Sequence, residues 1–102
     1  MIKKYTANDI AIMHVGDELD RIVHELNDRG EKHHWLHVPE YSTDLTELIM
    51  LMSELKDYGK YITVTTTPGG FRTEFKGTVT ESYNVSESVC KAYVIGSIQY
   101  NK

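Results

Sequence analysis

The chain has 102 residues, of which 40% are hydrophobic and 25% are charged, with a formal net charge of −4 and one cysteine. These values are typical of a single globular domain, here residues 1–102, that buries a core without metal or disulfide staples. The lone cysteine excludes an internal disulfide framework, and the acidic balance disfavours broad binding to nucleic acid.

The N-terminal third predicts a strand followed by a helix. Residues 10–15 form a short apolar run that ends at Gly16, which predicts a strand buried on both faces, although a helix starting at Asp9 is the alternative. From Asp17 the spacing predicts a helix that Gly30 ends, with an apolar face made by Leu19, Ile22, Val23 and Leu26. No apolar run reaches the ~20 residues that cross a bilayer, and no signal-peptide pattern opens the chain. We therefore expect a cytoplasmic protein without a membrane segment.

Residues 31–38 predict a second strand, closed by Pro39, which disfavours helical geometry for the residue before it. On such a strand His33, Trp35 and His37 share one face. The order of strand, helix and strand predicts a right-handed βαβ unit.

The spacing predicts a helix over residues 45–58, with Asp44 and Glu47 placed as a capping box and Gly59 suited to end it. Its apolar stripe consists of Leu45, Leu48, Ile49, Met52 and Leu55. Met50 and Leu51 extend this stripe into five consecutive apolar residues, more than the one apolar face of an ordinary surface helix. The helix is therefore either packed on two sides or in contact with another chain, and Met50 and Leu51 are the candidates for self-association.

The last third predicts a β-hairpin, residues 61–67 and 71–80, joined by a turn at Pro68-Gly69-Gly70. A polar loop over 84–88 and a final strand over 91–100 complete the pattern. Tyr93 and Ile95 then fall on the outward face of that strand, which suggests a partner surface. The expected fold is α+β, with two helices packed on one face of a mixed sheet and a C-terminal three-stranded antiparallel meander.

The histidines are the only candidate metal ligands. His33 and His37 lie about 7 Å apart along the predicted strand, at ~3.3 Å per residue, with His34 on the opposite face, so a third ligand would have to come from elsewhere, such as His14, His24 or a carboxylate. No catalytic or zinc motif accompanies them, so we expect no metal and no cofactor. Cys90, between apolar neighbours, is expected to be buried and not to act as a nucleophile.

Composition favours a protein that works by binding, because the seven tyrosines and one tryptophan are residue types enriched at interfaces. We expect a non-catalytic protein that contacts another protein, such as an inhibitor or immunity-type partner, and that forms a homodimer. The expected contact residues are Trp35, His37, Arg72, Tyr93 and Ile95. Two alternatives remain open: a binder of a small molecule or nucleotide, with Arg72 and His37 in a pocket at a dimer interface, and a histidine-dependent metalloenzyme.

Overall fold

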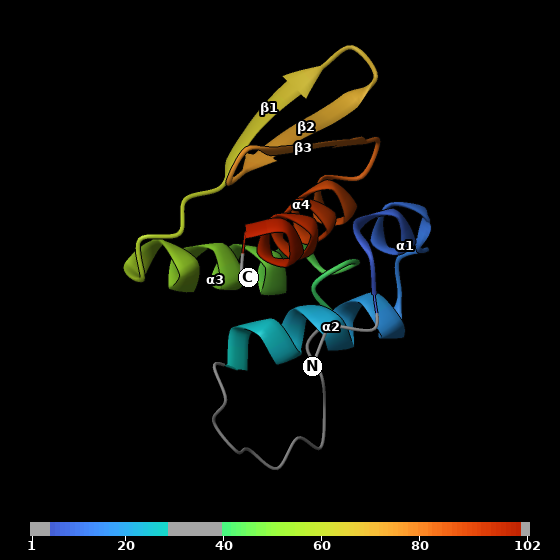
Figure 1. The fold of residues 1–102 in the computed structure, drawn as a ribbon. Coiled ribbons are helices and arrows are strands. Elements are labelled where there is room, and N and C mark those ends of the chain that lie inside the picture. The colour runs from blue at the N-terminus through green and yellow to red at the C-terminus, as the bar shows by residue number, and fades with distance from the viewer. Residues whose placement is uncertain (1–4, 29–39, 101–102) are drawn as a thin grey trace.

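The computed structural model describes residues 5–28 and 40–100. In this part of the chain the fold is α+β, as predicted, with a three-stranded antiparallel sheet on one side of helix α4 and helices α1 and α2 packed against that helix (Figure 1). The elements are α1 (Ala7–Ile12), α2 (Asp17–Asp28), α3 (Leu45–Asp57), β1 (Thr63–Thr67), β2 (Gly70–Phe75), β3 (Thr78–Ser82) and α4 (Val85–Tyr100).

Helix α4 occupies the position expected of a strand, so the predictions for residues 84–88 and 91–100 were wrong. Asn84 starts this helix, because its side-chain oxygen accepts hydrogen bonds from the backbone N–H groups of Ser86 (2.8 Å) and Glu87 (3.3 Å). The helix is buried on several sides, with its core residues being Val89, Cys90, Ala92, Tyr93, Val94 and Ile95. A helix that is apolar nearly all round has no polar face, so the 3.6-residue period is hidden in its sequence.

The sheet is a meander of consecutive strands in the order β1-β2-β3. The turn at Pro68-Gly69 is confirmed, but a second turn at Lys76-Gly77 divides the strand expected over 71–80. Both residues have positive φ (51° and 81°), which is the requirement of a type I′ hairpin turn. The turn places Thr78 opposite Phe75, so Thr78 is buried while Val79 is 46% exposed.

Polar groups and a close approach hold the sheet against α4. The hydroxyls of Thr73 and Ser88, both buried, lie 2.7 Å apart, and the hydroxyl of Thr80 donates to the carbonyl of Ser88 (2.6 Å). At the other end of the contact Gly96 lies directly against Phe75.

Helix α1 replaces the strand expected over residues 10–15, so the helical alternative was the better interpretation. Thr6 and Asp9 form a reciprocal capping box, in which each side chain accepts from the backbone N–H of the other. Helix α2 begins at Asp17, as predicted. Without a strand at 10–15 the expected βαβ unit does not form. The second strand of that unit, over residues 31–38, lies outside the described residues.

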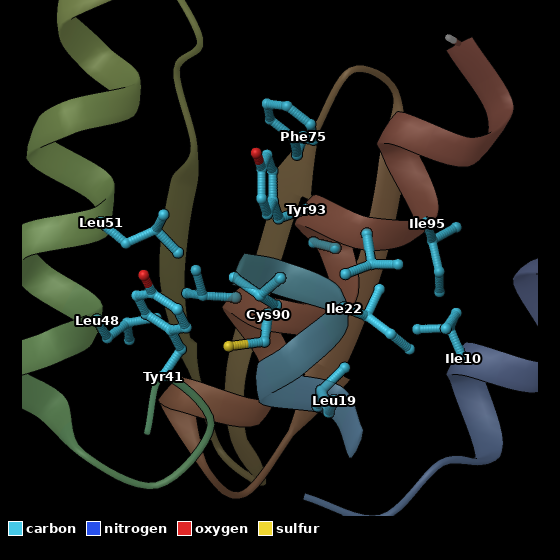
Figure 2. Packing of buried hydrophobic residues seen from close by; sticks show 14 of the residues in the cluster. Ile10, Leu19, Ile22, Tyr41, Leu48, Leu51, Phe75, Cys90, Tyr93 and Ile95 are labelled. Carbon is cyan, nitrogen blue, oxygen red and sulfur yellow. The ribbon is translucent and has the colours of Figure 1, made fainter. Parts of the chain in front are cut away.

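The core is built around α4 rather than around α3. Figure 2 shows side chains from the other helices around α4, with Leu48 and Leu51 of α3 on the side of Cys90, Ile10 of α1 beside Ile95, and Leu19 and Ile22 of α2 between them. Tyr93 of α4 meets Phe75 of β2 edge to face, with ring centroids 5.5 Å apart.

Candidate functional site

An exposed apolar strip runs along α3 beside the face that enters the core. Leu48, Leu51 and Leu55 point inward and are almost fully buried. Leu45 and Ile49 are 53% and 54% exposed, and Met52 is half-buried. These three residues follow one another at i, i+4 and i+7, so they form a continuous line on the helix. Leu45 and Ile49 of the α3 strip are therefore apolar surface that the described residues leave uncovered, and Met52, which packs partly against the core, continues the line.

A groove continues the α3 strip toward the sheet. It has a volume of about 260 Å³ and is lined by Ile49, Met52, Ser53, Lys56, Lys60, Tyr61 and Ile62. Tyr61 is 68% exposed, so a large aromatic side chain stands beside the apolar line.

The end of α3 explains why Tyr61 and Ile62 come to lie beside the helix. The N–H groups of Gly59 and Lys60 donate to the carbonyls of Lys56 (3.0 Å) and Leu55 (2.9 Å), which is the Schellman arrangement. Gly59 has φ +77°, a left-handed conformation that glycine adopts without strain, so the predicted helix end is confirmed. Asp44 caps the other end by accepting from the N–H groups of Thr46 and Glu47.

Strand β1 begins one residue after the groove and forms an edge of the described sheet. Its sequence, Thr-Val-Thr-Thr-Thr, contains no charge and no proline. Charged residues and proline are what natural proteins commonly use to keep an edge strand from pairing with other chains, so β1 lacks this protection, and no described strand pairs with its outer side.

No family model, curated protein or solved structure matches the chain. The functional argument therefore rests on the geometry of the described residues alone.

The structure separates the two residues expected to mediate self-association. Met50 is 62% exposed, whereas Leu51 is 1% exposed and belongs to the core. Met50 also lies about 100° around the helix from Ile49 and about 140° from Leu45, at 100° per residue, so it is outside the strip. Tyr93 and Ile95, expected on an outward strand face, are buried in α4 and are not exposed contact residues in this structure.

Of the remaining predicted contact residues, Arg72 lies within the described part of the chain. Arg72 lies on the face of the sheet away from α4, with its guanidinium 3.8 Å from Glu74 and half of its side chain exposed. Trp35, His33 and His37 lie outside the described residues. Within 5–28 and 40–100, no three His, Cys, Asp or Glu side chains form a group that could hold a metal ion.

The sequence contained a signal for the strip that was assigned to the wrong residues. Helix α3 carries two adjacent apolar lines, one at Leu48, Leu51 and Leu55 and one at Leu45, Ile49 and Met52. Five consecutive apolar residues indicated a second apolar face, but without the orientation of the helix the sequence could not show which line enters the core.

A second, larger hollow of about 640 Å³ lies where α1, the β1–β2 turn and α4 meet. Two of its charged side chains are bonded to each other and to neighbouring elements: Lys91 donates to Glu87 (2.8 Å) and to the carbonyl of Ala11 (3.0 Å), and Ser82 donates to Glu87 (2.6 Å). The hydrogen bonds that Glu87 accepts from Lys91 and Ser82 lower its pKa, and the bond from Lys91 has the larger effect. Because these hydrogen bonds join α4 to β3 and to α1, we assign the network a structural role.

The thiol of Cys90 is buried in the core. Burial raises the pKa of Cys90 far above its ordinary value, and the negative charge of Asp20 adds to that effect. Asp20 itself is held by the backbone N–H of Ser42 (2.8 Å), whose hydroxyl accepts from the N–H of Gly16 (3.0 Å). These bonds attach the segment before α3 to α2. In the part of the chain that the structure describes, no helix is long and apolar enough to span a membrane.

Proposed function

We propose that this protein is a non-catalytic binding protein that acts through contact with another protein at the α3 strip. The observation that carries the proposal is the uncovered apolar line of Leu45, Ile49 and Met52, continued by the groove beside Tyr61. Aliphatic, methionine and tyrosine side chains gathered on a surface are typical of interface centres, where a few residues supply most of the binding energy. An inhibitor or immunity-type role fits a small protein that works in this way.

The homodimer expected from the sequence is the competing occupant of the same surface. If it forms, it uses Leu45, Ile49 and Met52 rather than Leu51, which is buried within one copy. A second copy and a different partner cannot both cover the strip, so the oligomeric state decides whether the strip is free to act on other proteins.

Photo-cross-linking from the strip tests the proposal. A benzoyl-phenylalanine in place of Ile49 is expected to cross-link a defined protein in the expressing cells, and the same group in place of Val79 is the matched control, because Val79 is similarly exposed but lies on the far face of the sheet. The cross-linked protein is then purified and its affinity measured. Ile49→Lys is expected to weaken binding at least tenfold, about 1.4 kcal/mol, while Val79→Lys leaves it unchanged. Equal cross-linking from both positions would overturn the proposal.

A further inference from the structure

The α3 strip and the open edge of β1 are parts of one surface. Both figures place α3 on the β1 side of the molecule, while β2 and β3 are the strands that contact α4. Ile62 lines the groove and Thr63 begins the strand, so the groove is continuous with the edge. A strand added beside β1 would thus have one end next to the groove.

The hydrogen-bonding groups of β1 show which residues would receive such a strand. Thr67 and Gly70 flank a two-residue turn and form the pair that closes the hairpin. Backbone groups alternate along an antiparallel strand, so Thr63, Thr65 and Thr67 direct theirs to β2. Val64 and Thr66 direct theirs to the opposite side, where the described sheet has no further strand.

The charge around the groove indicates the chemistry of the occupant. Lys56 and Lys60 both line it. The acidic residues of the same turns of α3, Glu54 and Asp57, lie more than 60° around the helix axis from Lys56, at 100° per residue. A chain of net charge −4 thus presents positive charge at this groove. Because these lysines are near the start of β1, a strand that runs antiparallel to β1 would bring its C-terminal end to them.

We propose that the occupant is an extended segment of a partner protein that adds antiparallel to the edge of β1. It places an apolar side chain in the groove against Ile49 and Met52 and an acidic group at its C-terminal end beside Lys56 and Lys60. Main-chain hydrogen bonds to Val64 and Thr66 supply affinity, and the groove with its lysines supplies specificity. This inference rests on the proposed function and states how the partner is recognised.

The test uses fluorescein-labelled peptides and the full chain, followed by fluorescence anisotropy. A panel of peptides alternates threonine with one apolar residue (leucine, isoleucine, valine or phenylalanine) and ends in two glutamates. At least one member is expected to bind with a Kd on the order of 100 μM or tighter, which is the weak affinity expected of a small, transient interface. Two control peptides are each expected to bind at least tenfold more weakly. One has lysines in place of the glutamates, and the other has methylated backbone nitrogens on the side that pairs with β1.

Variants of the protein separate edge pairing from non-specific attraction. Thr66→Pro removes an outward N–H of an edge strand, where proline is tolerated, and is expected to abolish peptide binding with the fold retained. Lys56→Glu is expected to reverse the preference between the acidic and basic peptides. Val79→Lys is the control that leaves binding unchanged.

Three outcomes would overturn the inference. The first is failure of every acidic peptide to bind, and the second is equal binding of the methylated and unmethylated peptides. The third is a dimer in sedimentation analysis that Thr66→Pro dissociates while no peptide binds, which would assign the edge to a second copy. In each case specific cross-linking from position 49 would still support the proposed function, so the two failures are distinguishable.

Discussion

Replacing Gly96 by alanine tests the position of α4 against the sheet. A Cβ at this residue would lie 2.6 Å from Cδ2 of the Phe75 ring and 2.9 Å from the Phe75 carbonyl oxygen. The ring can rotate away, but the backbone oxygen belongs to a paired strand and cannot move without shifting β2. Overpacking of this kind costs about 1–3 kcal/mol.

The opposing effect is the higher helix propensity of alanine, which favours Gly96→Ala by about 1 kcal/mol. Because the clash includes a backbone atom, we expect the upper part of the overpacking range and a net loss of about 1–2 kcal/mol in the free energy of unfolding. For a domain of this size the midpoint of thermal unfolding falls by roughly 5–10 °C.

Urea denaturation followed by far-UV circular dichroism measures the change, with Ser53→Ala on the exposed side of α3 as the control for propensity alone. The double variant Gly96→Ala/Phe75→Leu is expected to recover part of the loss, because it removes the ring contact and leaves the contact with the carbonyl. An increase of about 1 kcal/mol in Gly96→Ala would refute the reasoning, since that is the result for a helix with free space at this residue.

Three further results follow from burial and charge. Leu51→Ala is expected to lower the free energy of unfolding by about 2–5 kcal/mol and Met50→Ala by no more than about 0.5 kcal/mol, measured by the same urea titrations; equal losses would contradict their assignment to core and surface. The thiol of Cys90 is expected to resist Ellman's reagent in the native protein and to react once urea unfolds it, so rapid native reaction would argue against its burial. Because the pKa of Glu87 is lowered, its ionised form stabilises the fold at pH values above the ordinary pKa of 4.5. This stabilisation is lost as the pH falls through the lowered pKa. Glu87→Gln is expected to cost about 1 kcal/mol at pH 7, with a difference from the wild type that shrinks toward zero in acid; a difference independent of pH would contradict the ion pair with Lys91.

The parts of the fold that the sequence predicted correctly are those with local signals. The α3 boundaries followed from Asp44 and Gly59, whose side chain and backbone conformation act on the nearest turn alone. The same is true of the Pro68-Gly69 turn, because its residues favour one backbone geometry regardless of the rest of the chain.

The errors arise where tertiary packing decides. Residues 91–100 are rich in the β-branched and aromatic residues that favour strands. A helix is the better structure here because a sheet packs on one side of it and helices pack on the other. One local signal was present: Asn84 followed by Glu87 has the spacing of a helix start, and it indicates a helix where a polar loop was expected.

The residues that α3 exposes differ in part from those expected at its surface. A surplus of apolar residues on α3 correctly indicated a second face, while the choice of Met50 and Leu51 depended on the rotation of the helix about its axis. That rotation is fixed by the contacts of Leu48 and Leu55 with distant residues, and no spacing within the helix encodes it.

The central place of α4 has a consequence for biosynthesis, because this helix follows all the elements that contact it. When the ribosome has completed residue 84, the apolar faces of the sheet, α1 and α2 have been made but the helix between them has not. At about 5–20 residues per second, the 16 residues of α4 take roughly 1–3 s to add. Until α4 has been made, the side chains of Leu19 and Ile10 have no helix to pack against, so we expect the nascent chain to bind chaperones that recognise apolar segments at the ribosome.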